Sequence, residues 1–291
     1  MHFNPRYTVI RNILITVFAL NIFVALAKGI YGYLTNSVSM LADGFHSLFD
    51  GTSNIIGLIG IYIASRPADP NHPYGHTKYE TFASLAIGTL LFITAVQILL
   101  SSYRRLFTGV APEVTEISFI IMLTTIAVNF AVTTFESRRG RQLKSELLIS
   151  DSLHTRSDIF VSLSVIGSLI AVRLGYPIVD VIVALIIAVI IGYMGFSIFR
   201  ESSDVLCDAC AIEREQIRSV VAMVNGVWDS HAIRTRGRKN EIYLDLHILV
   251  DPKISVNRAH KIADEVELEV KKFYPEVADV LVHVEPYGVH G

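Results

Sequence analysis

Two pairs of ionisable residues lie inside long apolar stretches of this chain, His46 with Asp50 and His154 with Asp158. Residues four apart share one face of a helix, so each pair would present an imidazole nitrogen and a carboxylate oxygen on the same side. Two such helices facing each other supply four ligands that suit zinc in a tetrahedral site. The alternative, polar side chains that hydrogen-bond between helices, accounts less well for two matched pairs. We therefore expect a metal site within the membrane, because a bound dication offsets the cost of these groups in an apolar setting.

A second group of metal-ligand types lies between residues 66 and 78, where three prolines break the chain. Asp69 is followed closely by His72 and His76, so one oxygen and two nitrogens could close on one metal ion. The alternative is an ordinary solvated loop. The spacing favours a metal site at the membrane surface.

A third group is spread over the C-terminal region. His231 and His247 fall on two neighbouring predicted strands, and His260 falls on a predicted helix. His283 and Glu285 are two apart on a further predicted strand, so they point to the same face. A single surface histidine usually binds no metal, but the grouping of these residues favours a metal site.

The composition indicates a membrane protein. Of 291 residues, 52% are apolar and 18% are charged, whereas soluble domains carry roughly 25% charged residues. The net charge of -2 and the lack of a basic run argue against a nucleic-acid-binding protein, and two cysteines cannot make a disulfide framework. Runs of roughly 20 apolar residues can cross a bilayer, and six transmembrane helices are the simplest count. The runs lie near 9–33, 38–64, 82–106, 115–135, 147–172 and 178–199.

Basic residues gather in two of the loops, between the second and third runs and between the fourth and fifth. Arg104, Arg105 and Arg173 lie on the opposite side, so the positive-inside bias is moderate. The N-terminal stretch has no small-residue cleavage site after its first apolar run. We expect a multi-pass protein of the cell's inner or plasma membrane, with both termini in the cytoplasm.

The composition changes after Arg200, where charged residues become frequent. We expect a six-helix transmembrane transport domain over residues 1–205 and a cytosolic metal-binding dimerisation domain over residues 206–291. The periodicities predict helix, strand, strand, helix and strand, an αββαβ order typical of an α+β domain with helices on one face of a small open sheet. A domain of this size is marginal alone, which favours dimerisation. The predicted elements are 212–224, 230–238, 241–250, 255–274 and 280–284.

Four stretches of this chain form recognisable motifs: SVSMLADGFHSLFD at 37–50, RPADPNHPYGHTKYE at 66–80, DSLHTRSD at 151–158 and VHVEP at 282–286. Together they resemble the cation diffusion facilitator family of divalent metal/proton antiporters, and the resemblance covers nearly the whole chain. It implies six transmembrane helices, a cytosolic αββαβ domain that is ferredoxin-like and metallochaperone-like, and a homodimer. It also implies a transporter rather than an enzyme, with divalent metal ions, protons and membrane lipid as partners.

The resemblance implies three metal sites. Histidine at the first position of both intramembrane pairs resembles the zinc transporters of the family, whereas an all-aspartate version is associated with manganese. Zinc is therefore the expected substrate and regulatory ion, with cadmium, iron, cobalt, nickel and manganese as alternatives. Glu285 stands where well-known bacterial members have aspartate. The implied ligands are His46, Asp50, His154 and Asp158 for transport, Asp69, His72 and His76 in the loop, and His231, His247, His260, His283 and Glu285 at a cytosolic dimer interface.

Two further groups lie close to the transport pairs. Asp43, three residues before His46, is a structural group, an auxiliary ligand or a proton acceptor, and the first reading is favoured because intramembrane acids often pair locally. Lys28 is its nearest formal counter-charge. Alternatively, the Lys28 side chain extends to the membrane surface.

Two remaining features lie near the junction of the expected domains. Cys207 and Cys210 form a C-x-x-C, a spacing shared by zinc sites and redox pairs; ordinary reduced thiols are favoured over transient metal capture. By analogy with the family, Lys78 and Asp204 could pair across the dimer as a hinge contact.

The resemblance implies alternating access, in which a metal ion leaves in exchange for protons. Histidine must be neutral to bind metal, so protonation of His46 or His154 competes with the ion. A membrane metalloenzyme is a weaker alternative, because the chain has neither H-E-x-x-H nor G-x-S-x-G. A receptor or scaffold that binds metal without transporting it would use the same ligands.

Overall fold

A computed structural model describes residues 5–34, 47–48, 51–108, 116–173 and 177–288. The chain separates into two compact units, Met1–Ser202 and Ser203–Gly291. Three of the residues discussed above, Asp43, His46 and Asp50, lie outside the described part of the chain.

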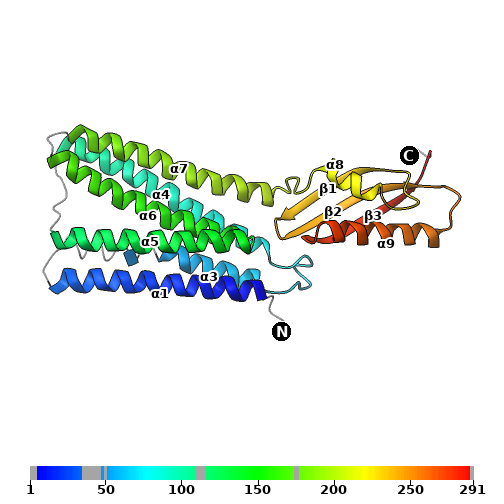
Figure 1. Ribbon diagram of the computed structural model, residues 1–291, viewed down its shortest axis with the longest axis horizontal. Helices are drawn as coiled ribbons and strands as arrows, with labels where there is room; N and C mark the ends of the chain where they lie inside the picture. Colours follow the sequence, from blue (N-terminus) through cyan, green and yellow to red (C-terminus); the bar gives the residue numbers. More distant parts are fainter. Residues whose placement is uncertain (1–4, 35–46, 49–50, 109–115, 174–176, 289–291) are drawn as a thin grey trace. The chain divides into compact units, whose positions relative to one another are not determined.

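The first unit is helical, and its long helices lie side by side with their axes roughly aligned (Figure 1). Each described helix overlaps one of the six apolar runs predicted from the sequence. The helices are α1 (Pro5–Leu34), α3 (Thr52–Ala64), α4 (Lys78–Thr108), α5 (Glu116–Gln142), α6 (Glu146–Arg173) and α7 (Pro177–Leu206), the last ending just inside the second unit.

Within the described residues, four helices are both long enough and apolar enough to cross a membrane: α1, α4, α5 and α7. The α6 helix has 28 residues, about 42 Å at 1.5 Å per residue, so its length also suffices, but it carries His154, Asp158 and further polar side chains. The described part of α3 is shorter, with 13 residues. The first unit is therefore a helical membrane domain.

Two buried apolar clusters hold this domain together, one formed by α1, α3, α4, α5 and α6 and the other mainly by α4 and α7. A Cβ atom at Gly60 would overlap the Cβ of Ala83, so only glycine lets α3 and α4 approach this closely. Gly88 on α4 lies against Ile198 of α7, and the Phe92 and Phe199 rings meet edge to face at 5.4 Å. The C-terminal part of α7 therefore lies beside the N-terminal part of α4.

An arginine joins the ends of several helices at one end of this domain. Arg6 on α1 donates to both carboxylate oxygens of Glu80 on α4, at 3.0 and 3.2 Å. It also donates to the carbonyl oxygens of Leu143 and Lys144, in the turn between α5 and α6. Ser145 in the same turn donates to Glu80. This network fixes where α6 begins relative to α1 and α4.

The second unit has the αββαβ order predicted from the sequence. Its three strands form a sheet in the order β1-β2-β3, in which β2 is antiparallel to β1 and parallel to β3. Gly237 closes the β1–β2 hairpin with a φ of +114°, a conformation that favours glycine. The elements are α8 (Arg214–Val221), β1 (Asp229–Arg238), β2 (Glu241–Val250), α9 (Val256–Phe273) and β3 (Val277–Pro286).

Side chains of β2 alternate between the two faces of the sheet, as a period of two requires. Leu244, Leu246 and Ile248 are buried and form one apolar core with side chains of α8 and α9. His247 lies between them in sequence and is only partly buried, so it points to the other face. Both helices thus cover one face, and the predicted histidine ligands of the strands are left on the open face.

Candidate metal centres

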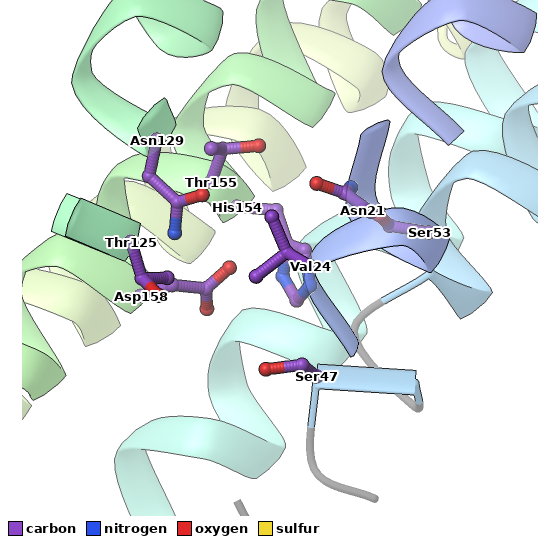
Figure 2. Close-up of a pocket in the computed structure, with 9 residues that line it drawn as sticks. All are labelled: Asn21, Val24, Ser47, Ser53, Thr125, Asn129, His154, Thr155 and Asp158. Carbon is purple, nitrogen blue, oxygen red and sulfur yellow. The ribbon is translucent and has the colours of Figure 1, made fainter. Parts of the chain in front are cut away.

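The predicted transport pair on α6, His154 and Asp158, lines a polar cavity within the helical domain (Figure 2). Asp158 directs its carboxylate into this space, and the His154 ring lies behind Val24. The backbone carbonyl of His154 accepts a hydrogen bond from Ser157, which closes this turn of α6. The cavity is lined by Asn21, Val24, Ser47, Ser53, Thr125, Asn129, His154, Thr155 and Asp158.

The other half of the predicted transport site, His46 and Asp50, lies outside the described residues. Ser47, which directly follows His46 in the chain, lines the same cavity as His154 and Asp158. The Lys28 ammonium donates to the Ser47 hydroxyl at 2.9 Å, and Lys28 is buried. Lys28 therefore supports the wall of this cavity, and the alternative that it extends to the membrane surface does not hold.

Sequence reasoning missed a buried polar network beside the transport pair. Asn21 on α1 donates to the side-chain oxygen of Asn54 on α3 at 2.9 Å, and Asn54 donates to the Asp151 carboxylate at 2.6 Å. Asp151 on α6 lies next to the Glu136 carboxyl of α5. The available signals were an ionisable residue, Asp151, inside a predicted transmembrane run and its three-residue spacing from His154.

The structure brings the three predicted loop ligands together. Asp69 Oδ1 accepts from the backbone N–H of Asn71 and His72, at 2.9 and 2.7 Å, and lies 3.1 Å from His72 Nδ1. Asp69 Oδ2 lies 3.5 Å from His76 Nε2. The two imidazole rings are 4.3 Å apart between centroids. One ligand atom from each of the three residues falls within 4.8 Å of the others.

The hydrogen bonding of His76 prepares it to bind a cation. Its ring is buried, and its Nδ1 lies 3.2 Å from the carbonyl oxygen of Pro67. Because a carbonyl only accepts, Nδ1 carries the proton in the neutral ring and Nε2 presents its lone pair toward Asp69. A nitrogen lone pair facing a carboxylate is a favourable place for a cation. Fixing one ring nitrogen in this way is typical of metal-binding histidines.

The pKa of Asp69 keeps its carboxylate available to metal. Desolvation acts to raise this pKa, but hydrogen bonds from the backbone and ring of His72 and from the backbone of Asn71 together lower it below its usual value. The stabilisation that comes with this shift is complete above the ordinary aspartate pKa and is lost as the pH falls through the lowered value. Near neutral pH the loop therefore retains an anionic ligand.

On the open face of the sheet, three histidines lie in register across the strands. His231 on β1 pairs with His247 on β2, which pairs with His283 on β3. Their neighbouring ring centroids are 5.2 and 4.7 Å apart. Glu285 lies among them, at 3.3 Å from His231 Nε2, 2.9 Å from His247 Nδ1 and 3.6 Å from His283 Nε2.

His260 is not part of this cluster in the single chain. It lies on α9, is exposed, and has Nε2 3.6 Å from a carboxylate oxygen of Asp264 one turn away. The α9 helix packs on the opposite, apolar face of the sheet. Its predicted role, in a site formed between two chains, remains a prediction.

The remaining predicted residues stand apart from these centres. Lys78 begins α4 in the first unit and Asp204 lies near the end of α7 in the second, so their pairing remains a prediction. Cys207 and Cys210 are free and exposed. The Cys210 thiol donates to the carbonyl oxygen of Ile212 at 3.0 Å, as an ordinary reduced thiol does.

Comparison with protein families accounts for both units. Residues 14–207 match the cation efflux transmembrane domain, and residues 211–287 match the cation efflux protein, cytoplasmic domain. The chain belongs to the cation diffusion facilitator family. Efflux of divalent cations, binding of these ions and dimerisation through the cytoplasmic domain come with this membership.

Individual relatives agree over most of their length. The chain is 33% identical to an uncharacterised transporter of Methanocaldococcus jannaschii, across 91% of this chain and 94% of that protein. It is 30% identical to the cation-efflux pump FieF of Shewanella oneidensis, across 88% and 86%. A solved variant of the MamM C-terminal domain is 27% identical, with a TM-score of 0.24, over 25% of this chain and 91% of that one.

As a member of this family, the protein is a multi-pass membrane transporter with a cytoplasmic C-terminal domain. The metalloenzyme alternative is thereby set aside. The fold also indicates on which side of the membrane the loop at residues 66–78 lies. Because α7 leads into the cytoplasmic domain and its C-terminal part lies beside the N-terminal part of α4, the loop before α4 is at the cytoplasmic end. The Asp69 cluster therefore lies at the cytoplasmic end of the membrane domain.

Proposed function

We propose that this cation diffusion facilitator exports zinc from the cytoplasm in exchange for protons, working as a homodimer by alternating access. The observation that carries the proposal is the shared cavity of His154, Asp158 and Ser47. Because Ser47 adjoins His46, this cavity is where four ligands from the two predicted pairs would meet. Two imidazoles and two carboxylates form a borderline-soft set that suits zinc.

The chemistry of the other two centres is compatible with zinc. Each combines imidazole nitrogens with one carboxylate, a set of ligands that zinc accepts. In the loop, the distances from Asp69 to the histidine nitrogens are 3.1 and 3.5 Å. On the sheet, the distances from Glu285 to the histidine nitrogens are 2.9, 3.3 and 3.6 Å. Cadmium, iron, cobalt, nickel and manganese are the competing ions.

The finer architecture belongs to the same proposal. The apolar run at 38–64 would complete a second transmembrane helix, which gives six, with both termini in the cytoplasm. The transport domain would cover residues 1–205 and the dimerisation domain residues 206–291. The open-face cluster would bind a regulatory ion with His260 of a second copy, since an ion held between two chains stabilises their association by mass action.

Uptake of metal into proteoliposomes under an imposed pH gradient tests the proposal. Wild-type protein is expected to accumulate zinc in preference to manganese and iron, and Asp158→Asn is expected to lose this flux. Asp279→Asn, at an exposed position on β3, is the matched control and should transport as the wild type does. Zinc binding without gradient-driven flux of any ion would instead identify a receptor or scaffold.

A further inference from the structure

Two carboxyl groups outside the proposed metal ligands are buried against each other in the membrane domain. Glu136 on α5 and Asp151 on α6 are both 0% exposed. Contacts on either side set the two helices face to face here: Thr133 on α5 donates to the carbonyl oxygen of Ser152 on α6, and Gly140 on α5 lies against Ile149. Glu136 falls between these contacts and interacts with Asp151.

Three oxygens of this pair are acceptors without a donor. Among the residues that the structure describes, both carboxylate oxygens of Glu136 and the Oδ1 atom of Asp151 are buried and have no hydrogen-bond partner. Asp151 Oδ2 is satisfied by Asn54. An ionised carboxylate can only accept, so two ionised groups cannot satisfy each other, and two negative charges so close and so buried repel strongly. A proton on one of them supplies the missing donor and removes one charge.

The pair is connected to the transport cavity but does not line it. Asp151 precedes His154 by three residues and Asp158 by seven, so all three lie on one face of α6. Asn54 links Asp151 to Asn21, which lines the cavity together with His154. The two carboxyl groups are absent from that lining.

Other charged groups of the surrounding helices have their own contacts. Arg6 pairs with Glu80, Lys28 donates to Ser47, and Glu146 accepts from Thr81. Within the described part of the chain, the charged or histidine side chains of α1, α3, α4, α5 and α6 that are buried or partly buried, besides the pair itself, are Arg6, Lys28, Glu80, Glu146, His154 and Asp158, whereas Arg11, Lys78, Arg138, Arg139, Arg141 and Arg156 are exposed.

We propose that Glu136 and Asp151 form a proton-binding site, separate from the metal ligands, that holds one exchangeable proton between two carboxyl groups. The inference rests on the proposed exchange of metal for protons and adds a place where one of the protons is carried. When a dication binds one helical turn away at His154 and Asp158, its positive charge opposes the bound proton. The proton then leaves to water, and the O–H bond of one carboxyl group is the only bond broken.

Proton release on zinc binding tests the site directly. Full-length protein in detergent would be titrated with zinc in weakly buffered solution containing a pH indicator. Glu136→Gln cannot release this proton and is expected to release about one proton fewer per chain than the wild type. Glu136→Asp retains the acid and should release as the wild type does. Glu146→Gln is the matched control, because Glu146 is also buried on α6 but has the Thr81 hydroxyl as a donor.

Two further measurements separate the outcomes. The wild type should show the infrared carbonyl band of a buried protonated carboxylic acid, and Glu136→Gln should remove this band. Absence of the band in the wild type would overturn the proposal. Loss of the band on addition of sodium would also overturn it, because it would show that the pair binds a metal cation. In proteoliposomes, Glu136→Gln should still carry zinc down its own gradient but with fewer protons per ion. Wild-type coupling that survives unchanged in Glu136→Gln refutes this site alone, whereas absence of coupling in the wild type refutes the proposed function.

Discussion

Replacement of Arg6 by alanine should destabilise the membrane domain strongly, because Arg6 is the cationic partner of a fully buried carboxylate. Its side chain is 13% exposed and that of Glu80 is 0% exposed. Arg6→Ala removes a bidentate ion pair and two further donors to the carbonyl oxygens of Leu143 and Lys144. Removing one partner of a buried pair costs about 3–5 kcal/mol. For a unit of this size, such a loss lowers Tm by roughly 6–20 °C.

A double-mutant cycle tests whether the loss of stability in Arg6→Ala comes from the unpaired Glu80 carboxylate. The unfolding of the helical domain in detergent would be followed for the wild type, Arg6→Ala, Glu80→Gln and the double variant. The double variant should recover a large part of the loss, since a neutral glutamine carries no uncompensated charge. Arg6→Lys keeps the charge but not the planar fork that reaches the carboxylate and both carbonyls, so an intermediate Tm is expected.

The matched control is Arg11→Ala, at an exposed position on the same helix, where a change within about 0.5 kcal/mol is expected. A wild-type Tm in Arg6→Ala would refute the reasoning that this pair fixes the start of α6. Equal losses in Arg6→Ala and in the double variant would show that the arginine acts through packing alone. The zinc flux of Arg6→Ala is expected to fall together with its Tm, because His154 and Asp158 lie on α6.

Three more predictions concern the loop, the sheet and the helix packing. His76→Ala should weaken zinc binding at the loop at least tenfold, as measured by equilibrium dialysis of Asp158→Asn protein, because it removes the nitrogen that faces Asp69. Glu285→Ala should weaken zinc-dependent dimerisation in analytical ultracentrifugation, whereas Glu285→Asp should retain part of it; an unchanged dimer in both would contradict a shared ion. Gly60→Leu should lower Tm by an amount equivalent to about 1–3 kcal/mol, because its side chain enters space held by Ala83.

The cytoplasmic domain was predictable because its periodicities are strong. Strand β2 alternates buried and partly buried residues along its whole length, and its observed bounds, Glu241–Val250, are those predicted. Strand β3 is longer than predicted, at Val277–Pro286 against 280–284. Its backbone continues to pair with β2 beyond the apolar centre, and hydrogen bonds between backbones leave no mark in the side-chain pattern.

The spatial grouping of the candidate ligands could be predicted from the sequence to different degrees, whereas their binding of metal remains a prediction. Asp69, His72 and His76 are close in sequence, so a short loop brings them together. The meeting of His231, His247 and His283 depends on strand register, which the predicted order of elements implies. The pairing of Arg6 with Glu80 and of Glu136 with Asp151 depends on which helices pack together, and spacing along one chain does not encode that.

The proposed carboxyl pair provides a proton site whose charge is separate from that of the four proposed transport ligands. Two carboxylates and a dication sum to zero, so the loaded ligand set is neutral, whereas the same set without metal carries two negative charges and needs protons to return through the membrane. Protons on those ligands and the metal exclude each other, because they use the same atoms. A proton on Glu136 or Asp151 uses different atoms, so its release is governed by electrostatics over a helical turn rather than by direct competition. Loss of Glu136 should therefore reduce the number of exchanged protons without abolishing exchange, whereas loss of Asp158 should abolish metal flux itself.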